Sequence, residues 1–146
     1  MRVTCLCFSL DNERYIHSVD CIRSIITYQE PNPLPGGPAG SLGMLDIRGG
    51  VLTIFSTRAL FGLPESEHPE DSKIVIFDTS GGSFGLQVDG VENIITLELD
   101  RVEHSVDGGN TPMITGTLEH QGSLLILVDF EHWMETNFGA EDGGAF

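Results

Sequence analysis

A chain of 146 residues is the length of one ordinary domain and buries about two-thirds of its unfolded surface on folding. Its hydrophobic fraction of 40% and charged fraction of 20% are those of a folded globular protein, not a disordered one. The net charge of −15, from 22 acidic and 7 basic residues, leaves no basic run for nucleic acid phosphates or an anionic membrane surface. Nucleic acid is therefore excluded as an expected partner.

The first apolar segment, residues 3–10, predicts a strand and a cellular location. It is too short to span a bilayer and lacks a small-residue cleavage site, so we expect a cytoplasmic protein with no direct membrane insertion. Cys5 and Cys7 fall on the same side of this strand, and with Cys21 they form an odd set without CxxC spacing. Buried, reduced thiols are favoured over a metal or redox role.

Short β-branched or aromatic runs, bounded by Gly, Asp, Asn or Pro, predict strands along almost the whole chain. In the first half these strands cover residues 3–10, 14–17, 22–28, 43–47 and 51–55. Residues 31–40 form a loop, because four prolines and three glycines disfavour both ladder bonds and helix. Residues 57–61 predict one helical turn stopped by Gly62 and Pro64, followed by an acidic connector at 65–71.

In the second half the predicted strands cover residues 73–79, 83–88, 91–97, 113–119 and 123–128, with a polar stretch at 100–110. The alternation is clearest over 83–88 and is typical of a half-buried antiparallel strand. One face carries Phe84, Leu86 and Val88, and the other carries Gly85, Gln87 and Asp89. Asp129 is placed to N-cap a last helix through Asn137, with Trp133 turned inward.

Ten short strands in two sets of five, separated by the acidic connector, predict an all-β fold. We expect two small barrels that share one apolar seam, with a short C-terminal helix. A single ten-stranded sandwich is the alternative.

No motif in the sequence predicts catalysis. Residues 81–85 match the letters G-x-S-x-G, but they lead into a predicted strand and not into the helix that a nucleophile turn requires. A phosphate-binding glycine loop and a dinucleotide-binding motif are absent from the sequence. Asp129-x-Glu131-His132 mixes ligand types at a strand-to-helix junction, where chance explains it better than metal binding. The five histidines lie far apart without metal-ligand spacing: His17, His68, His104, His120 and His132. We expect no enzyme, no metal and no cofactor.

One segment, residues 43–50, concentrates glycine around Arg48 between two apolar strands. An arginine beside a turn is most often a solvated turn residue. In a chain this acidic, two further explanations remain open. Arg48 pairs with a local carboxylate and orders the turn, or it offers a bidentate fork to a partner.

An ordered set of motifs resembles the CheW family, the chemotaxis coupling proteins that join a histidine kinase to chemoreceptors. The similarity runs from about Val3 to Trp133, nearly the whole chain. It is carried by Tyr15 in the second strand, residues 33–38, 43–49, Arg58 just past the next strand, 73–77, 85–91 and 124–129. The resemblance implies two packed five-stranded SH3-like barrels and an adaptor without catalytic residues.

The resemblance also implies partners and partner-binding residues. In such proteins one barrel surface contacts the regulatory domain of a CheA-like histidine kinase, and an apolar groove holds the cytoplasmic tip of a chemoreceptor. Matched onto the family's motifs, the partner-binding residues implied are Ile22, Ser24, Arg48, Arg58, Asp89 and Val91. We expect a single domain over residues 1–137, an acidic and glycine-containing tail at 138–146, and association with membrane receptor arrays through the partners.

Three departures from the family pattern leave the kinase, the receptor and the response open. Ser24 replaces the Glu of Val-x-Glu-Ile, residues 46–49 replace Asn-Leu-Arg-Gly, and residues 53–56 replace Pro-x-x-Asp. A coupler that binds both partners at once is the leading hypothesis. A stand-alone regulator that competes for one partner without coupling is the alternative, supported only by Ser24. A small enzyme or ligand-binding barrel has least support, since no convergent polar set is visible.

Overall fold

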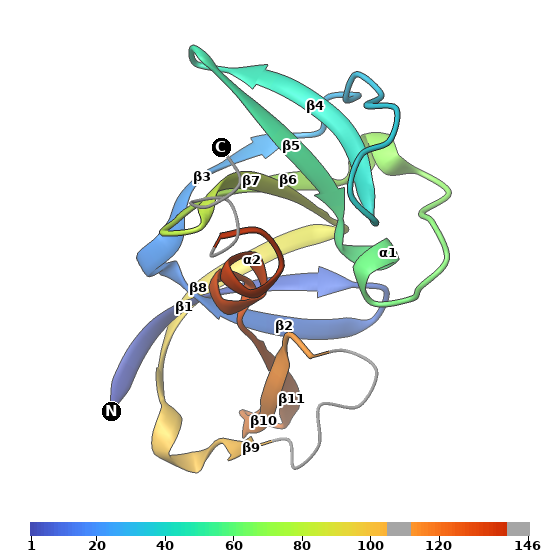
Figure 1. Cartoon of the computed structure of the whole chain (residues 1–146). Coiled ribbons are helices and arrows are strands. Elements are labelled where there is room, and N and C mark those ends of the chain that lie inside the picture. Colours follow the sequence, from blue (N-terminus) through green and yellow to red (C-terminus); the bar gives the residue numbers. More distant parts are fainter. Residues whose placement is uncertain (105–111, 140–146) are drawn as a thin grey trace. The chain divides into compact units, whose positions relative to one another are not determined.

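The computed structural model describes residues 1–104 and 112–139. In these ranges the chain forms eleven strands in two sheets and two short α-helices (Figure 1). The strand order is β8-β1-β2-β11-β10-β9 in one sheet and β3-β6-β7-β5-β4 in the other. Both orders are linear, so strand ladders close neither described sheet into a ring. The predicted all-β class with a short C-terminal helix is confirmed. Where two five-stranded barrels were expected, the described residues form one sheet of six strands and one of five.

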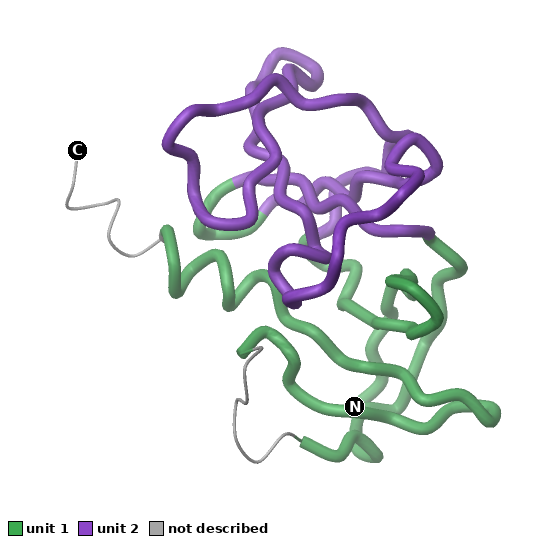
Figure 2. Tube along the Cα trace, turned by 90° about the vertical axis from the view of Figure 1, so that its right-hand side faces the viewer, with its two compact units in different colours: residues 1–21, 79–82, 91–146 green, residues 22–78, 83–90 purple. Residues whose placement is uncertain are grey.

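The two sheets belong to two compact units that alternate along the sequence (Figure 2). Unit 1 comprises Met1–Cys21, Thr79–Gly82 and the described residues from Val91 onward, and unit 2 comprises Ile22–Asp78 and Ser83–Gly90. The predicted division at the acidic connector is wrong, because residues 65–71 lie inside unit 2. Strand periodicity does not reveal this arrangement, since it carries no information on which strands pair.

Unit 1 is built on the six-stranded sheet. Its elements are β1 (Arg2–Leu10), β2 (Glu13–Ser18), η1 (Val19–Cys21), β8 (Gly90–Glu98), η3 (Leu99–Arg101), β9 (Glu103–His104), β10 (Ile114–His120), β11 (Ser123–Val128), α2 (Phe130–Met134) and η4 (Glu135–Gly139). Strand β9 was not predicted, because two exposed polar residues leave no periodic signal. Residues 105–110 of the predicted polar stretch and 140–146 of the predicted tail lie outside the described residues.

The core of unit 1 confirms the expectation of buried thiols. Cys5 and Cys7 pack with Ile16, Leu97 and Leu125 in one cluster. All three cysteines are buried and free. Burial raises the pKa of each thiol, and it raises the pKa of Cys21 to about 11, so the thiols stay protonated at neutral pH.

The C-terminal helix α2 begins at two side chains of unit 1. Asp129 is its N-cap, as predicted, and its carboxylate accepts a hydrogen bond from the His132 amide at 2.9 Å. The buried imidazole of His17 accepts a second one at Nε2, from the Phe130 amide at 2.9 Å. Nδ1 of the same ring lies 2.9 Å from the Ser18 carbonyl, so Nδ1 carries the proton and the ring is neutral. Trp133 is buried, as predicted.

His17 should make the protein less stable in mild acid. Burial lowers the pKa of His17 below its ordinary value of 6.5, so the unfolded chain takes up a proton that the folded chain resists. The free energy of unfolding should therefore fall as the pH drops below about 6.5. In His17→Gln, whose amide oxygen can still accept from Phe130, this dependence should weaken, whereas the control His104→Gln should keep it. Urea titrations at pH 7.5 and 5.5, followed by the fluorescence of Trp133, measure the free energy of unfolding of the wild type and of both variants. An identical pH dependence in all three proteins would refute this role of His17.

Unit 2 is built on the five-stranded sheet. Its elements are β3 (Ile22–Thr27), β4 (Ser41–Ile47), β5 (Gly50–Ser56), α1 (Thr57–Leu60), η2 (Pro69–Asp71), β6 (Lys73–Thr79) and β7 (Gly82–Val88). The predicted helical turn is confirmed as α1. The Ser56 hydroxyl caps it by accepting from the Ala59 amide at 3.1 Å, and Gly62, at φ 75°, follows its end.

Strand β7 differs from its prediction. It pairs in parallel with β5, and it is buried on both faces instead of one. Phe84 on one face stacks on Phe77 at 5.1 Å and meets Phe55 edge-on at 6.4 Å. On the other face Gly85 is buried, because its missing side chain lets three isoleucines of the sheet close over it: Ile54, Ile74 and Ile76.

Gly85→Ala should overpack this second face. The added Cβ would lie 2.6 Å from Ile54 Cδ1 and 3.0 Å from Ile74 Cγ2, so we expect a loss of about 1–3 kcal/mol in the free energy of unfolding. Adding Ile54→Val, which removes the nearest methyl group, should restore part of it. Gly50→Ala is the matched control, since its Cβ would meet only the Ile47 carbonyl at 3.8 Å. Equal stability of the two alanine variants in urea would contradict the expected clash.

Candidate partner-binding surface

The six residues predicted to bind partners fall into four places. Arg58 and Asp89 contact one another in unit 2, Ile22 and Ser24 lie on β3, Arg48 lies in the β4–β5 turn, and Val91 lies half-buried at the start of β8. Val91 belongs to unit 1, whereas the other five belong to unit 2. The structure thus brings Arg58 and Asp89 into contact, places Ile22 and Ser24 on one strand, and leaves Arg48 and Val91 on other elements.

Arg58 and Asp89 form a bidentate ion pair. Arg58 Nε donates to Asp89 Oδ1 at 2.8 Å and Nη2 donates to Oδ2 at 2.6 Å, while Nη1 donates to the Pro64 carbonyl at 2.8 Å. The two side chains are only 14% and 23% exposed. Such a fork geometry in partial burial is stronger than an ordinary surface pair. The pair fixes the segment after α1 to the end of β7.

Strand β3 is an edge of its sheet and presents two unlike faces. Ser24 lies on the half-buried face, which also carries Ile26 against the core of unit 2. Ile25 lies on the opposite face and is 40% exposed. The ladder to β6 shifts register between Ile22 and Ser24. Ile22 lies on the other side of this register shift, opposite Phe77, whereas Ser24 lies opposite Ile76. The exposed apolar side chain of this strand is therefore that of Ile25, which is next to Ser24 in the sequence.

Arg48 occupies a strained turn position. Arg48 and Gly49 link Ile47 to Gly50 as a two-residue hairpin loop, with φ of 49° and 83°. Such loops favour Asn, Asp or Gly at the first position, because other side chains crowd the backbone there. The exposed guanidinium forms no hydrogen bond or ion pair with any residue in 1–104 or 112–139. The explanation that Arg48 staples the turn to a local carboxylate thus finds no support in the described part of the chain.

We define the hairpin-tip surface as Asp46, Arg48 and Val51, which are all exposed. Val51 is 59% exposed and pairs across the hairpin with Asp46. The sequence did not single out Val51, because β5 carries apolar residues on both faces and the pattern does not tell which end is covered. The surface combines a charged fork with an apolar side chain, a combination common at the centre of protein interfaces.

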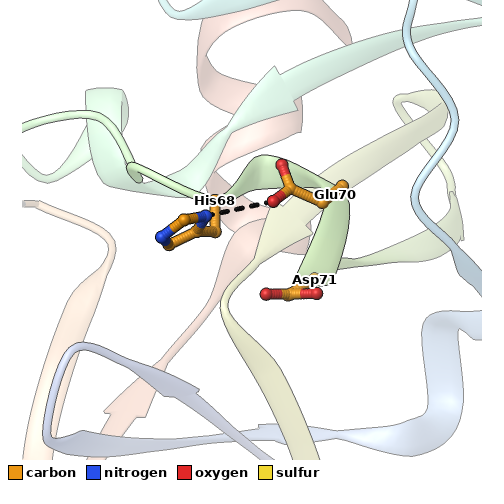
Figure 3. Close-up of side chains that lie close together, drawn as sticks. All are labelled: His68, Glu70 and Asp71. Carbon is orange, nitrogen blue, oxygen red and sulfur yellow. Dashed lines mark hydrogen bonds and ion pairs between the residues drawn. The ribbon is translucent and has the colours of Figure 1, made fainter.

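A separate group of possible metal ligands lies in the acidic connector. His68, Glu70 and Asp71 have ligand atoms within 4.8 Å of one another, and Nδ1 of His68 lies 3.1 Å from Glu70 Oε2 (Figure 3). The imidazole of His68 contributes to lowering the pKa of Glu70, after a hydrogen bond to the Glu70 backbone. All three side chains are exposed, and the contact between His68 and Glu70 accounts for how close the ligand atoms lie. The group therefore needs no ion to explain it.

In its described residues the chain is an all-β domain built of two compact units. The model of the CheW-like domain matches residues 4–137, and the chain belongs to this family. The chain is 27% identical to the chemotaxis protein CheW of Bacillus subtilis over 125 residues, covering 84% of this chain and 80% of that protein. It is 24% identical to CheW of Rhizobium meliloti over 129 residues, covering 86% and 83%.

A solved structure shows the same fold. The scaffolding protein TtCheW from Thermoanaerobacter tengcongensis superposes with a TM-score of 0.79 at 22% identity, covering 88% of this chain and 90% of that one. The predicted family resemblance is confirmed. Among the described residues, no helix has the length and apolar character needed to cross a membrane.

The Arg58–Asp89 pair should contribute more to stability than the chain's exposed pairs. Asp89→Asn leaves a partly buried guanidinium without its counter-charge, and we expect a loss of about 1.5–3 kcal/mol in the free energy of unfolding. Arg58→Lys should lose a similar amount, since an ammonium cannot form the fork. The control is Arg14→Lys, whose pair with Glu92 is 48% and 36% exposed and should contribute under about 1 kcal/mol. A smaller effect at Asp89 than at Arg14 in urea unfolding would refute this ranking.

Proposed function

We propose that this protein couples a CheA-like histidine kinase, through the regulatory domain of the kinase, to the cytoplasmic tip of a chemoreceptor. Membership in the CheW-like family over residues 4–137 supports this, as does the likeness to the chemotaxis protein CheW of Bacillus subtilis and to the scaffolding protein TtCheW. On this proposal residues 1–137 form the adaptor domain. The protein then works in the cytoplasm, held at receptor arrays by its partners.

Coupling of this kind is a matter of geometry. An adaptor that holds two partners converts two weak contacts into one assembly, because the second binding event becomes effectively intramolecular. Each contact then needs only a small apolar centre with a polar rim. The exposed apolar side chains of unit 2 supply such centres: Ile25, Leu34 and Val51.

The observation that carries the proposal is the unpaired Arg48 in its strained turn. An arginine there costs local stability compared with Asn or Gly, on the order of 1 kcal/mol. Arg48 departs from the preference of this turn for Asn, Asp or Gly, and no contact in the described chain compensates for the cost. Such a departure points to a role in binding another molecule. We propose Arg48 as the main charged contact to a partner. Its planar fork suits a carboxylate, so the partner surface it meets is acidic.

The other implied residues take different roles in the proposal. Arg58 and Asp89 already bind one another, so they position the surrounding backbone and are not free to contact a partner with their full charge. Ile22, Ser24 and Val91 are half-buried, so Ile22 and Val91 contribute smaller apolar contacts and the Ser24 hydroxyl a polar one.

Arg48→Asn separates binding from folding. Asparagine suits the positive φ of this turn, so the free energy of unfolding should stay constant or rise by up to about 1 kcal/mol. Loss of a charge-assisted contact should weaken partner binding by about 1.5–3 kcal/mol, roughly 10- to 150-fold. Calorimetric titration with the kinase regulatory domain and with a receptor cytoplasmic fragment measures this. Arg2→Asn, at an exposed arginine of unit 1, is the matched control.

Coupling and competition are distinguished by mixing both partners with the protein. A coupler yields a ternary complex in analytical ultracentrifugation and raises kinase activity in the presence of receptor. A competitor yields only binary complexes, and an excess of it dissociates any complex of kinase and receptor. Unchanged affinity of Arg48→Asn for both partners would remove Arg48 from the proposal.

A further inference from the structure

Unit 1 carries a surface that the family resemblance did not single out. Strands β2 and β11 lie in parallel, with Arg14 opposite Leu125, and each begins directly after a two-residue hairpin turn. Parallel strands that begin in register have their preceding turns at the same edge of the sheet. The turn at 11–12 and the turn at 121–122 therefore lie side by side.

Two hollows flank the starts of these strands. One, of about 380 Å³, is lined by Asn12, Glu13, Arg14, Ser123, Leu124 and Ile126. The other, of about 340 Å³, also includes Arg14 and Ser123 in its lining. Arg14 and Ser123 thus form a ridge between them, joined by a hydrogen bond of 3.3 Å from Nη1 to Oγ.

Leu124 lines the first hollow and is 57% exposed, although its neighbour Leu125 is 3% exposed. It is flanked by carboxylates on both adjacent strands. On β10 its cross-strand partner is Glu119, and on β2 the register that places Arg14 opposite Leu125 places Glu13 beside Leu124. We call Leu124, Ile126, Glu13 and Glu119 the Leu124 surface.

The charge of this surface is negative. Glu13 and Glu119 are exposed and form no ion pair with any residue in the described ranges. The nearby Arg14 does not offset them, because its Nε lies 3.1 Å from Glu92 Oε1. An apolar side chain between two uncompensated carboxylates is complementary to an apolar side chain between two cations.

We propose that the Leu124 surface binds a protein segment in which an apolar side chain is flanked by lysine or arginine on either side. Burying Leu124 and Ile126 supplies the apolar part of the affinity, and Glu13 and Glu119 select the flanking charges. A second copy of this chain is a poor occupant, since it carries a net charge of −15 and would bring like charges together. This contact does not depend on the coupling role of Arg48.

Three short peptides test the proposal by calorimetry with the full chain. The first holds Arg-Leu-Arg-Leu-Arg between Gly-Ser ends, the second replaces Arg by Glu, and the third replaces Leu by Ser. We expect the first to bind roughly tenfold more tightly than either other peptide. Its affinity should fall when salt is raised from about 20 to 200 mM, because exposed charges are screened.

Matched variants locate the binding. Leu124→Ser should weaken the first peptide roughly tenfold, whereas Val51→Ser, at an equally exposed apolar residue of unit 2, should change it less than twofold. Glu13→Gln with Glu119→Gln should weaken it at least threefold and flatten the salt dependence, and Glu30→Gln with Glu67→Gln should do neither.

Equal losses at the surface and control positions would overturn the proposal and show non-specific attraction to an acidic protein. Self-association that Leu124→Ser abolishes would overturn it in favour of a second copy of the chain. Arg48→Asn should leave peptide binding unchanged, so failure here is distinct from failure of the coupling proposal. Melting curves followed by circular dichroism confirm that each variant is folded.

Discussion

The parallel pairing of β5 with β7 is the constraint on which unit 2 depends. Because the two strands run in the same direction, both end at one edge of the sheet, and the residues that follow them meet there. Arg58 follows β5 and Asp89 follows β7, so the pairing creates their bidentate contact. The third donor of Arg58, bound to the Pro64 carbonyl, extends the contact to the residue that precedes the acidic connector. The guanidinium of Arg58 thus joins α1, the end of β7 and the segment that follows α1.

Local structure was largely predictable from the sequence, because the residues that end each element act over short distances. Gly62 and Ser56 define α1, and Asp129 begins α2. The division into units was not predictable, since β2–β11 and β5–β7 pair segments that are far apart in the chain. The residues of a turn specify where a strand ends, but they do not specify which other strand pairs with it. Gly85 shows the same limit, because the tolerance of a buried glycine depends on side chains of other strands.

For the surface, the sequence identified charged residues and left their use undecided. Arg58 and Asp89 were both implied as partner-binding residues, but their spacing of 31 positions does not reveal that they bind one another. Arg48 was identified with its alternatives open, and only the backbone angle and the missing carboxylate favour an external role. Val51 and Leu124 were missed, because alternating strands with two apolar faces do not indicate which apolar residue stays exposed.

The few cations of this chain make their placement informative. Of seven basic residues, Arg14, Arg23 and Arg58 are held in ion pairs in the described chain, while Arg48 stands exposed and unpaired in a turn that disfavours it. A partner surface that fits Arg48 is therefore acidic, whereas one that fits the carboxylates around Leu124 is basic. Each partner would meet like charge at the wrong surface, which costs affinity there. On these proposals, the guanidinium of Arg48 and the carboxylates around Leu124 would thus select partners of opposite charge at separate surfaces.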